Sequence, residues 1–347
     1  MASKPSSRAR PNIRMVAEHL NLSPATVSLA LRGSESIAPE TRARVLAAAR
    51  ELNYIPAPRA ARPSPAAGRT LLFLTKDFGD RPVTANPFYG EILGAVERAS
   101  TEAGDRLIFS LLPEEERRPE QLAASFAGQH HDGLLVVGAY PGAVIRQLMA
   151  LTEAPIVLVD NIVPGLPCDS VMADDFGGAR LAVSHLFEQG HRRIAMIAGD
   201  LTIPSFAERY RGYRAACAEL GLAPAQPAVA TWDRAVLREA LDDILAQQPR
   251  PTAIFCATDA FAVFVMELLR DVGLHVPDDL SVVGFDNLPI ARMAHPPLTT
   301  MHNHPQELGR IAMQRLLLRI SGNTDPALNI TVATQLVVRE STKEAKS

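Results

Sequence analysis

Short apolar runs recur along most of this chain, separated by roughly twenty to thirty residues. Segments with the spacing of amphipathic helices lie between them, among them 91–103, 177–189, 206–220 and 261–272. Strands that are apolar throughout and alternate with helices are typical of parallel sheets covered on both faces. The pattern therefore predicts an α/β body, and its roughly 270 residues allow two lobes. The runs are TLLFLT (70–75), RLIFSLL (106–112), GLLVVGA (133–139), PIVLVD (155–160), RIAMIAGD (193–200), TAIFCATD (252–259) and SVVGFD (281–286).

The residues before this body carry the pattern of short helices instead. A first helix is expected between Asn12, which can cap it, and Asn21, a residue type that readily adopts the left-handed conformation. Ser23 can cap a second helix, with Pro24 in the first turn, where a missing N–H costs nothing. Two caps so close together predict a helix-turn-helix. The apolar face of the first helix is expected to hold Ile13, Val16, Ala17 and Leu20.

A third helix is expected from Pro39 to about Asn53. Ala38 stands at its cap position and offers no side-chain acceptor, which costs about 1 kcal/mol. Its apolar stripe is predicted to consist of Val45, Leu46, Ala49 and Leu52.

A proline-rich segment divides the chain into two parts of opposite charge. PAPRAARPSPAAG (56–68) contains four prolines and no large apolar side chain, which predicts a linker rather than part of a core. The 347 residues together carry a net charge of −3. Residues 1–69, however, hold eleven Lys and Arg against four Glu, whereas the remainder holds 24 basic and 34 acidic side chains. A basic head on an acidic body predicts that a polyanionic partner would bind the head.

Several classes of protein are excluded by the composition. With 47% apolar and 21% charged residues, the chain is neither disordered nor fibrous. No apolar run reaches the length of about 18 residues that spans a bilayer, and no secretory leader is visible, so we expect a cytoplasmic protein without membrane contact. The three cysteines, Cys168, Cys217 and Cys256, are odd in number and far apart, and we interpret them as small buried side chains.

The chain also lacks the signatures of catalysis and of cofactor binding. It contains no GxxxxGK[ST] phosphate loop, no GxGxxG, no GxSxG and no HExxH motif. The metal-like spacings, His130–His131 and His302-x-His304, have no Cys or carboxylate at ligand spacing. We therefore assign no catalytic residue, no metal and no cofactor, and expect a protein that is not an enzyme.

Aspartates end several of the apolar runs. In open parallel sheets the ligand site lies beyond the carboxyl ends of the strands, where Asp160, Asp200, Asp259 and Asp286 fall, with Asp77 shortly after the first run. Asp259 directly precedes a helical segment, and we interpret it as the cap of that helix. Asp160 and Asp286 are each followed by a proline-containing loop, so no helix requires their carboxylates. These two are candidate ligand-binding residues.

Arg209 and Trp232 complete this candidate site. A carboxylate pair, a forked guanidinium and a flat ring together suit a polyhydroxylated ligand, because they offer bidentate partners for hydroxyls and an apolar face for the ring. Residue type alone leaves two alternatives open, a surface ion pair for Arg209 and a core position for Trp232.

The head closely resembles the LacI family of bacterial transcription regulators. The resemblance covers NIRMVAEHLNLSPATVSLALRGSESIAPETRARVLAAARELNYIP (12–56), and LSPATVS at 22–28 matches the core of the family's recognition helix. It continues in family order to Thr342. The matching blocks are NPFYGEILGAVERA (86–99), DGLLVVGA (132–139), PIVLVDN (155–161), GHRRIAMIAGD (190–200), ERYRGYRAA (208–216), PTAIFCATD (251–259), VPDDLSVVGFDN (276–287), PPLTT (296–300) and LVVREST (336–342).

The resemblance implies a small all-α helix-turn-helix domain followed by a two-lobed α/β domain with parallel sheets, similar to type I periplasmic binding proteins. It implies a homodimeric repressor whose head enters the major groove of a pseudo-palindromic double-stranded operator. The expected domains are the helix-turn-helix at 12–56, a hinge at 57–69 and an effector-binding and dimerisation domain at 70–342. Within the last, the N-lobe is expected at about 70–172 and 303–330, and the C-lobe at about 173–302 and 331–342.

The family's DNA-reading positions carry over to seven residues of the head. Pro24, Ala25 and Leu29 match base-reading positions, while Ser23, Thr26, Ser28 and Arg32 match backbone and flanking contacts. Leu29 replaces the arginine with which most members read guanine, which favours an apolar contact such as one to a thymine methyl. In the linker, Pro63 replaces the leucine that typically enters the minor groove, so the prolines disfavour a hinge helix.

The resemblance also assigns an effector site. Asp160, Ser205, Arg209, Trp232 and Asp286 match the family's effector-binding positions, and the two aspartates are those already selected by their strand-end positions. Thr258 and Pro305 depart from residues common in sugar-responsive relatives.

Our leading hypothesis from the sequence is a repressor whose operator affinity changes when a small metabolite, with a sugar favoured, binds between the lobes. Release of DNA by the sugar is the favoured direction, and purine-type corepression is the alternative. A ligand-binding protein without DNA activity is the second candidate function, and a sugar-processing α/β enzyme is the third.

Overall fold

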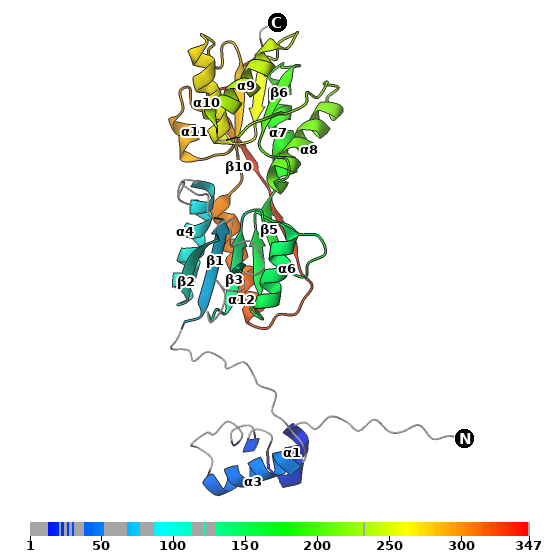
Figure 1. Cartoon of the computed structure of the whole chain (residues 1–347), viewed down its shortest axis with the longest axis vertical. Coiled ribbons are helices and arrows are strands. Elements are labelled where there is room, and N and C mark those ends of the chain that lie inside the picture. Colours follow the sequence, from blue (N-terminus) through cyan, green and yellow to red (C-terminus); the bar gives the residue numbers. More distant parts are fainter. Residues whose placement is uncertain are drawn as a thin grey trace, which may run out of the picture. The chain divides into compact units, whose positions relative to one another are not determined.

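The computed structural model describes residues 13–20, 22–23, 26–27, 30, 38–51, 68–76, 87–112, 121–122, 130–231 and 233–345. The chain forms two compact units, Met1–Ala67 and Gly68–Ser347 (Figure 1). The boundary between them falls between the last two residues of the proline-rich segment.

The first unit contains α1 (Ile13–Leu20) and α3 (Pro39–Glu51), which pack around a small apolar cluster. Ser23 Oγ accepts a hydrogen bond from Thr26 N at 3.0 Å, so the predicted cap of the second helix is confirmed. Leu22 N donates to Ala17 O at 2.9 Å and satisfies a carbonyl at the end of α1. The buried cluster consists of Val16, Ala17, Val27, Ala30, Val45 and Ala48.

The predicted stripe of the third helix is partly wrong. Leu46 is 41% exposed, whereas Val45, Ala48 and Ala49 are buried. Because successive helical residues are rotated by about 100°, Leu46 lies off the face that Val45 and Ala48 share. Several expected positions lie outside the described residues or have undescribed side chains: Asn12, Ile13, Asn21 and Leu52.

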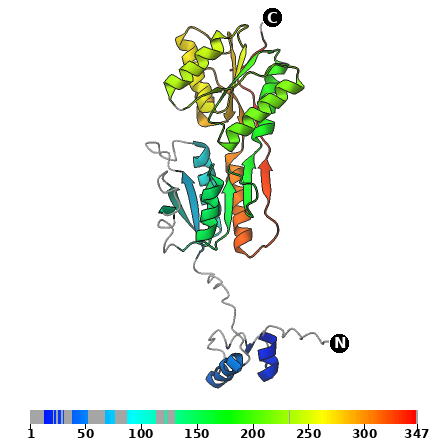
Figure 2. The same ribbon diagram turned by 45° about the vertical axis from the view of Figure 1, so that its right-hand side comes forward.

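The second unit contains two six-stranded sheets, each covered by helices on both faces (Figures 1 and 2). The sheet of the N-lobe is parallel throughout. α4 (Pro87–Glu102) and α12 (Pro305–Ile320) pack on one face, and α6 (Gly142–Leu151) packs on the other. The strands in spatial order are β11 (Asn329–Val332), β5 (Asp169–Ala173), β4 (Ile156–Val159), β3 (Gly133–Val137), β1 (Thr70–Lys76) and β2 (Arg106–Leu112).

The sheet of the C-lobe differs in having one antiparallel edge, where β12 pairs with β10. Two apolar clusters lie on its two faces. The strands in spatial order are β12 (Gln335–Val337), β10 (Thr299–His302), β9 (Ser281–Asp286), β8 (Ala253–Cys256), β6 (Ile194–Ala198) and β7 (Ala228–Val229). The helices are α7 (Asp175–Glu188), α8 (Pro204–Glu219), α9 (Arg234–Ala246), α10 (Asp259–Asp271) and α11 (Pro289–Met293).

These two sheets confirm the predicted fold class. Each of the seven apolar runs forms a strand, and the four expected helical segments belong to α4, α7, α8 and α10. The chain passes between the lobes after β5, after β10 and after β11. The expected lobe boundary at 330 falls inside β11, which pairs with β5, so the third passage lies at 333–334.

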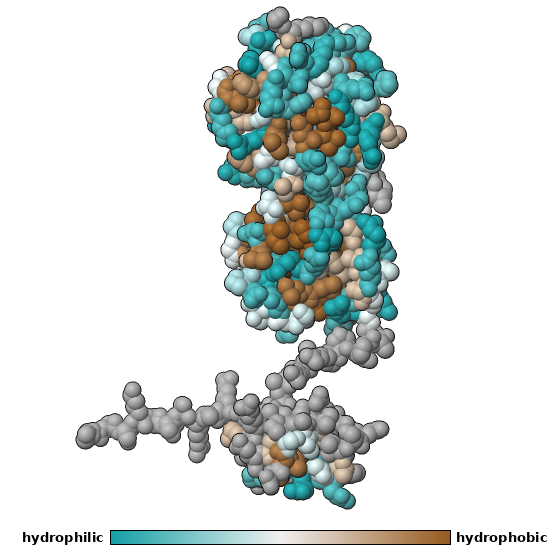
Figure 3. All heavy atoms as spheres, turned by 180° about the vertical axis from the view of Figure 1, so that it is seen from behind, coloured by the Kyte–Doolittle hydropathy of each residue, from teal (hydrophilic) through white to brown (hydrophobic). Residues whose placement is uncertain are grey.

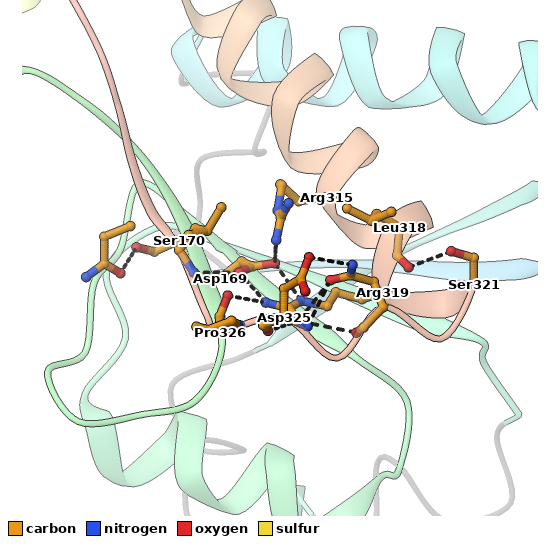
Figure 4. A network of polar contacts seen from close by, with 11 residues as sticks. Asp169, Ser170, Arg315, Leu318, Arg319, Ser321, Asp325 and Pro326 are labelled. Carbon is orange, nitrogen blue, oxygen red and sulfur yellow. Dashed lines mark hydrogen bonds and ion pairs between the residues drawn. The ribbon is translucent and has the colours of Figure 1, made fainter.

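A buried carboxylate fixes one end of the N-lobe. Asp169, 1% exposed at the start of β5, accepts hydrogen bonds from Arg319 Nη2 at 2.8 Å and Arg315 Nε at 3.1 Å. It also accepts from Leu328 N at 2.7 Å. Figure 4 shows both arginines of α12 converging on this carboxylate. The network therefore ties β5 to the end of α12 and to the segment leading into β11.

Two further expectations from the sequence can be compared with the described residues. Cys168, Cys217 and Cys256 are free and buried, as predicted. Among the helices of the described segments, none is long and apolar enough to cross a membrane.

Candidate functional site

A buried arginine lies at the centre of the candidate site. Arg209 is 4% exposed, and its Nε donates to Asp175 Oδ1 at 2.8 Å. Its Nη2 lies 3.1 Å from Asp286 Oδ1, and its Nη1 donates to Ala257 O at 2.5 Å. The guanidinium also stacks on the ring of Phe285, with 3.8 Å between Cζ and the ring centroid. The alternative of a surface ion pair for Arg209 is therefore wrong.

The close approach of α7 and α8 brings Arg209 to Asp175. Gly212 lies one turn after Arg209, and a Cβ at this position would come 2.2 Å from the backbone oxygen of Phe176. Only glycine permits this distance between the helices. Because Asp175 begins α7 and Arg209 lies in the second turn of α8, the two charged side chains meet where the helices start.

Asp160 and Asp286 lie at the carboxyl ends of strands in different lobes, after β4 and at the end of β9. Their φ angles are +53° and +108°, values that turn the chain sharply and that few residue types other than glycine tolerate. Asp160 Oδ2 accepts a hydrogen bond from Tyr89 Oη at 2.8 Å. Asp286 Oδ1 accepts one from Asn303 Nδ2 at 3.0 Å, in the passage after β10. Both lobes therefore contribute carboxylates to the site.

Burial shifts the acidity of this group. It raises the pKa of Asp160 to about 7, and the charge of Asp175 adds to the shift while Tyr89 and Arg209 oppose it. It raises the pKa of Asp286 to about 6, against the influence of Arg209. The pKa of Asp175 is also raised by burial, in spite of its ion pair with Arg209. Three carboxylates thus surround one guanidinium, and the negative charge is only partly compensated.

The other predicted effector residues are Ser205 and Trp232, and two further strand-end aspartates were Asp77 and Asp200. Ser205 is half-buried in the first turn of α8, one turn before Arg209 and on the same face. Trp232 and Asp77 lie outside the described residues. Asp200 is exposed and accepts a hydrogen bond from Thr202 N at 2.8 Å, so it stabilises its own turn.

The interpretation of Asp259 as a helix cap is wrong. Thr258 caps α10, because its Oγ1 accepts a hydrogen bond from Phe261 N at 3.2 Å. Asp259 is the first helical residue and is fully buried. Its carboxylate accepts hydrogen bonds from Leu288 N at 2.6 Å and from Thr300 Oγ1 at 2.5 Å. The carboxylate therefore connects α10 to the loop after β9.

Sequence reasoning missed three residues of the site: Asp175, Tyr89 and Asn303. Asp175 follows Asp174, whose side chain caps α7 by accepting from Gly177 N at 2.8 Å, so the pair is easily taken for ordinary cap residues. Tyr89 lies within α4, and Asn303 directly follows β10, a strand that the sequence does not predict. Asp175 also follows β5, a strand that none of the seven apolar runs predicts, so the strand-end criterion could not select it.

The two metal-like histidine spacings lie in described parts of the chain. The rings of His302 and His304 lie 4.1 Å apart between centroids, and burial lowers the pKa of His302. Within the parts of the chain that the structure describes, no group of three or more His, Cys, Asp or Glu side chains could hold a metal ion.

Of the seven candidate DNA-contacting residues, two are described. Ser23 is exposed and Thr26 half-buried, and their hydroxyl oxygens lie 2.8 Å apart at the start of the second helix. Outside the described residues lie Pro24, Ala25, Ser28, Leu29 and Arg32.

Two family models match the chain. The model described as bacterial regulatory proteins, lacI family, matches residues 12–57. The model described as a periplasmic binding protein-like domain matches residues 183–342.

Relatives and solved structures match over nearly the whole length. The HTH-type transcriptional regulator CelR of Thermobifida fusca is 34% identical over 342 residues, which are 96% of this chain and 99% of CelR. The structure of a transcriptional regulator CelR–cellobiose complex matches with a TM-score of 0.72 and 30% identity, over 96% of this chain and 100% of that one. A lac repressor dimer bound to operator and the anti-inducer ONPF matches with a TM-score of 0.70 and 26% identity, over 96% of this chain and 99% of that one.

Replacing Asp160 by asparagine is expected to change how stability depends on pH. Its carboxyl has a pKa of about 7 in the folded protein and about 4 in an unfolded chain, so folding is favoured by protonation, and stability falls as the pH rises between these values. The Asp160→Asn variant lacks this loss. Relative to the parent, its free energy of unfolding should rise by about 4 kcal/mol between pH 4 and pH 8, measured by urea unfolding.

The exposed Asp243→Asn variant on α9 is the matched control and should show no such change. A difference between Asp160→Asn and the parent that is constant across this pH range would contradict the prediction.

Proposed function

The chain belongs to the LacI family of bacterial regulatory proteins and is a transcriptional regulator, and we propose that it is a homodimeric repressor controlled by an uncharged sugar. The sugar would bind at Arg209, Asp160 and Asp286. The single observation that carries this proposal is the placement of Asp160 and Asp286. They end strands of two different lobes and share one buried arginine as their nearby cation.

The charge of the site supports an uncharged ligand. Arg209 already donates to Asp175, to Asp286 and to the Ala257 carbonyl, so three of its five N–H groups are engaged within the protein. What the site offers is carboxylate oxygen, which accepts hydrogen bonds from hydroxyl groups. A phosphorylated sugar would bring further negative charge beside these buried carboxylates, at a large electrostatic cost. A polyhydroxylated neutral ligand supplies donors without that cost.

The comparison with CelR supports a sugar within this class. A solved complex of a structurally similar regulator contains cellobiose. A ligand that contacts both lobes binds one arrangement of the lobes better than another, and operator DNA also prefers one arrangement. Binding of the ligand therefore changes the affinity for DNA, and binding of DNA changes the affinity for the ligand by the same factor. We favour release of the operator by the sugar.

Exposed apolar surface supports a homodimer. β2 is an edge strand, and its Ile108, Phe109 and Leu111 are between 36% and 41% exposed. Ile290 and Met293 of α11 are 40% and 82% exposed. Figure 3 shows apolar patches on both lobes. Unpaired apolar edges are normally covered, because they otherwise promote uncontrolled association.

We propose that the head reads the operator. The candidate base-reading residues are Pro24, Ala25 and Leu29, and the candidate backbone and flanking contacts are Ser23, Thr26, Ser28 and Arg32. The surplus of basic residues in this part of the chain supports attraction to DNA.

Selection of DNA sites from random oligonucleotides tests the reading role of Leu29. The parent should select a pseudo-palindrome, and Leu29→Arg should enrich guanine at one position in each half-site, since arginine reads guanine through two hydrogen bonds. Arg32→Gln, at a flanking-contact position, should keep the selected sequence and weaken binding with a shallower salt dependence. If the parent selects no sequence at low salt, the chain is a ligand-binding protein without operator recognition.

Asp286→Asn tests the effector site. Purified protein is titrated with cellobiose and other neutral sugars while its affinity for the selected operator is followed by fluorescence anisotropy. A hydrogen bond from a sugar hydroxyl to a charged carboxylate contributes about 2 kcal/mol, so its loss should raise the sugar concentration for half response by roughly 30-fold. Asp200→Asn, at an exposed strand end, should respond like the parent. An unchanged response in Asp286→Asn would place the effector elsewhere.

Phe109→Asp tests the dimer. A charge placed on the exposed apolar edge of β2 cannot be buried against a second copy without a large penalty, so the variant should sediment as a monomer where the parent is a dimer. Exposed Val229 of the C-lobe edge strand β7 provides the control, and Val229→Asp should leave the dimer intact. A dimer of unchanged affinity in Phe109→Asp would contradict the proposed interface.

A further inference from the structure

The turn after β9 is held by side chains of the C-lobe. Leu288 N donates to Asp259 Oδ2 at 2.6 Å. Asn287 Oδ1 accepts a hydrogen bond from Arg339 Nη2 at 2.6 Å, and Asn287 N donates to Thr300 Oγ1 at 3.4 Å. The backbone of this turn is thus held by α10 and β10, and the side chain of Asn287 is held by the segment after β12.

The side chain of Leu288 packs in the other lobe. Leu288 is 6% exposed and belongs to the apolar cluster on one face of the N-lobe sheet. All other buried members of this cluster lie in β1, β3, β4, β5, α4 and α12, among them Phe88 and Leu308. A residue whose backbone is bound in one lobe and whose side chain is buried in the other connects the two directly.

The conformation of the turn shows that this placement is enforced. Asp286 and Asn287 have φ angles of +108° and +56°, two consecutive positive values in residues other than glycine. Asparagine adopts the left-handed value of Asn287 readily, whereas the value of Asp286 lies outside that region and persists only where the surrounding contacts impose it. Gly284 supports the same arrangement, because a Cβ there would lie 2.4 Å from Asp259 Oδ1 and displace the carboxylate that holds Leu288 N.

We propose that Leu288 is a positioning residue that holds the two lobes in one relative arrangement. Burial of its side chain in the N-lobe cluster favours the arrangement in which the turn after β9 reaches that cluster. Truncation removes the apolar contact and leaves the hydrogen bonds of the turn within the C-lobe. The lobes should then sample several arrangements, although each lobe keeps its own core.

Distances between spin labels, measured by double electron–electron resonance, test this role in the full chain. The labels are attached at Glu102→Cys on α4 and Arg270→Cys on α10, both exposed, and labelled chains are diluted with unlabelled protein. Buried Cys168, Cys217 and Cys256 do not require replacement. The parent should give one narrow distance distribution, and Leu288→Ala should at least double its width.

Two variants separate this role from general loosening. Leu298→Ala removes the same atoms from a fully buried position in a C-lobe cluster and should lower the melting temperature without widening the distribution. Leu288→Met keeps an apolar side chain of similar volume and should restore the narrow distribution. If Leu288→Ala does not fold, Leu288→Val replaces it and should widen the distribution to a smaller extent.

The proposal is overturned by an unchanged distribution in a folded Leu288→Ala or Leu288→Val variant, or by equal widening in Leu298→Ala. Widening in Leu288→Met as large as in Leu288→Ala would also overturn it, since apolar burial would then not be the cause. Because neither DNA nor sugar is present in the measurement, its outcome is independent of the proposed repressor function.

Discussion

The structure of the candidate site depends on the burial of one guanidinium. An arginine removed from water must be paired, and its hydrogen bonds must be satisfied, or the protein loses several kcal/mol. Arg209 meets this requirement with Asp175, Asp286 and the Ala257 carbonyl. These partners belong to α7, the end of β9 and the end of β8, so a single charge fixes the relative positions of three segments. Gly212 makes this pairing possible, because α8 can approach α7 closely enough only where residue 212 has no Cβ.

Three carboxylates surround the single positive charge of Arg209, so the site has more acidic groups than are needed to pair it. This surplus of carboxylates determines which groups the site can bind. Asp160 has Tyr89 as a hydrogen-bond donor but no direct ion pair with Arg209 among the described contacts. Its raised pKa reflects burial first and the neighbouring carboxylates second. Burial makes these carboxyl groups costly to ionise, and a hydrogen bond donated by a ligand hydroxyl stabilises the charged carboxylate. The group is therefore suited to binding ligands that carry several hydroxyls. Ligand binding and deprotonation should therefore favour each other at Asp160.

Much of the fold was predictable because buried parallel strands are apolar throughout. The seven runs are strands for this reason, and Asp160 and Asp286 were selected because carboxyl strand ends meet at one edge. β5, β7, β10, β11 and β12 were not predicted, since they lie at or near sheet edges and most contain polar residues, such as Asp169, Thr299 and Asn329. Asp259 was misinterpreted because local capping preference cannot show that Leu288 N and Thr300 Oγ1 come to its carboxylate from distant segments. Asp175 was missed for a similar reason, because its partner lies 34 residues away on another helix.

The loop after β9 connects the candidate site to the core of the N-lobe. Asp286 faces Arg209, and Leu288, two residues later, packs in the core of the N-lobe. Both residues are carried by the same strained turn, which Asp259 and Arg339 hold from the C-lobe. At the proposed effector site, a ligand bound to the Asp286 carboxylate would therefore act on the backbone that positions Leu288. Because packed cores adopt discrete arrangements and do not deform continuously, a small displacement of this turn is enough to favour one lobe arrangement over another.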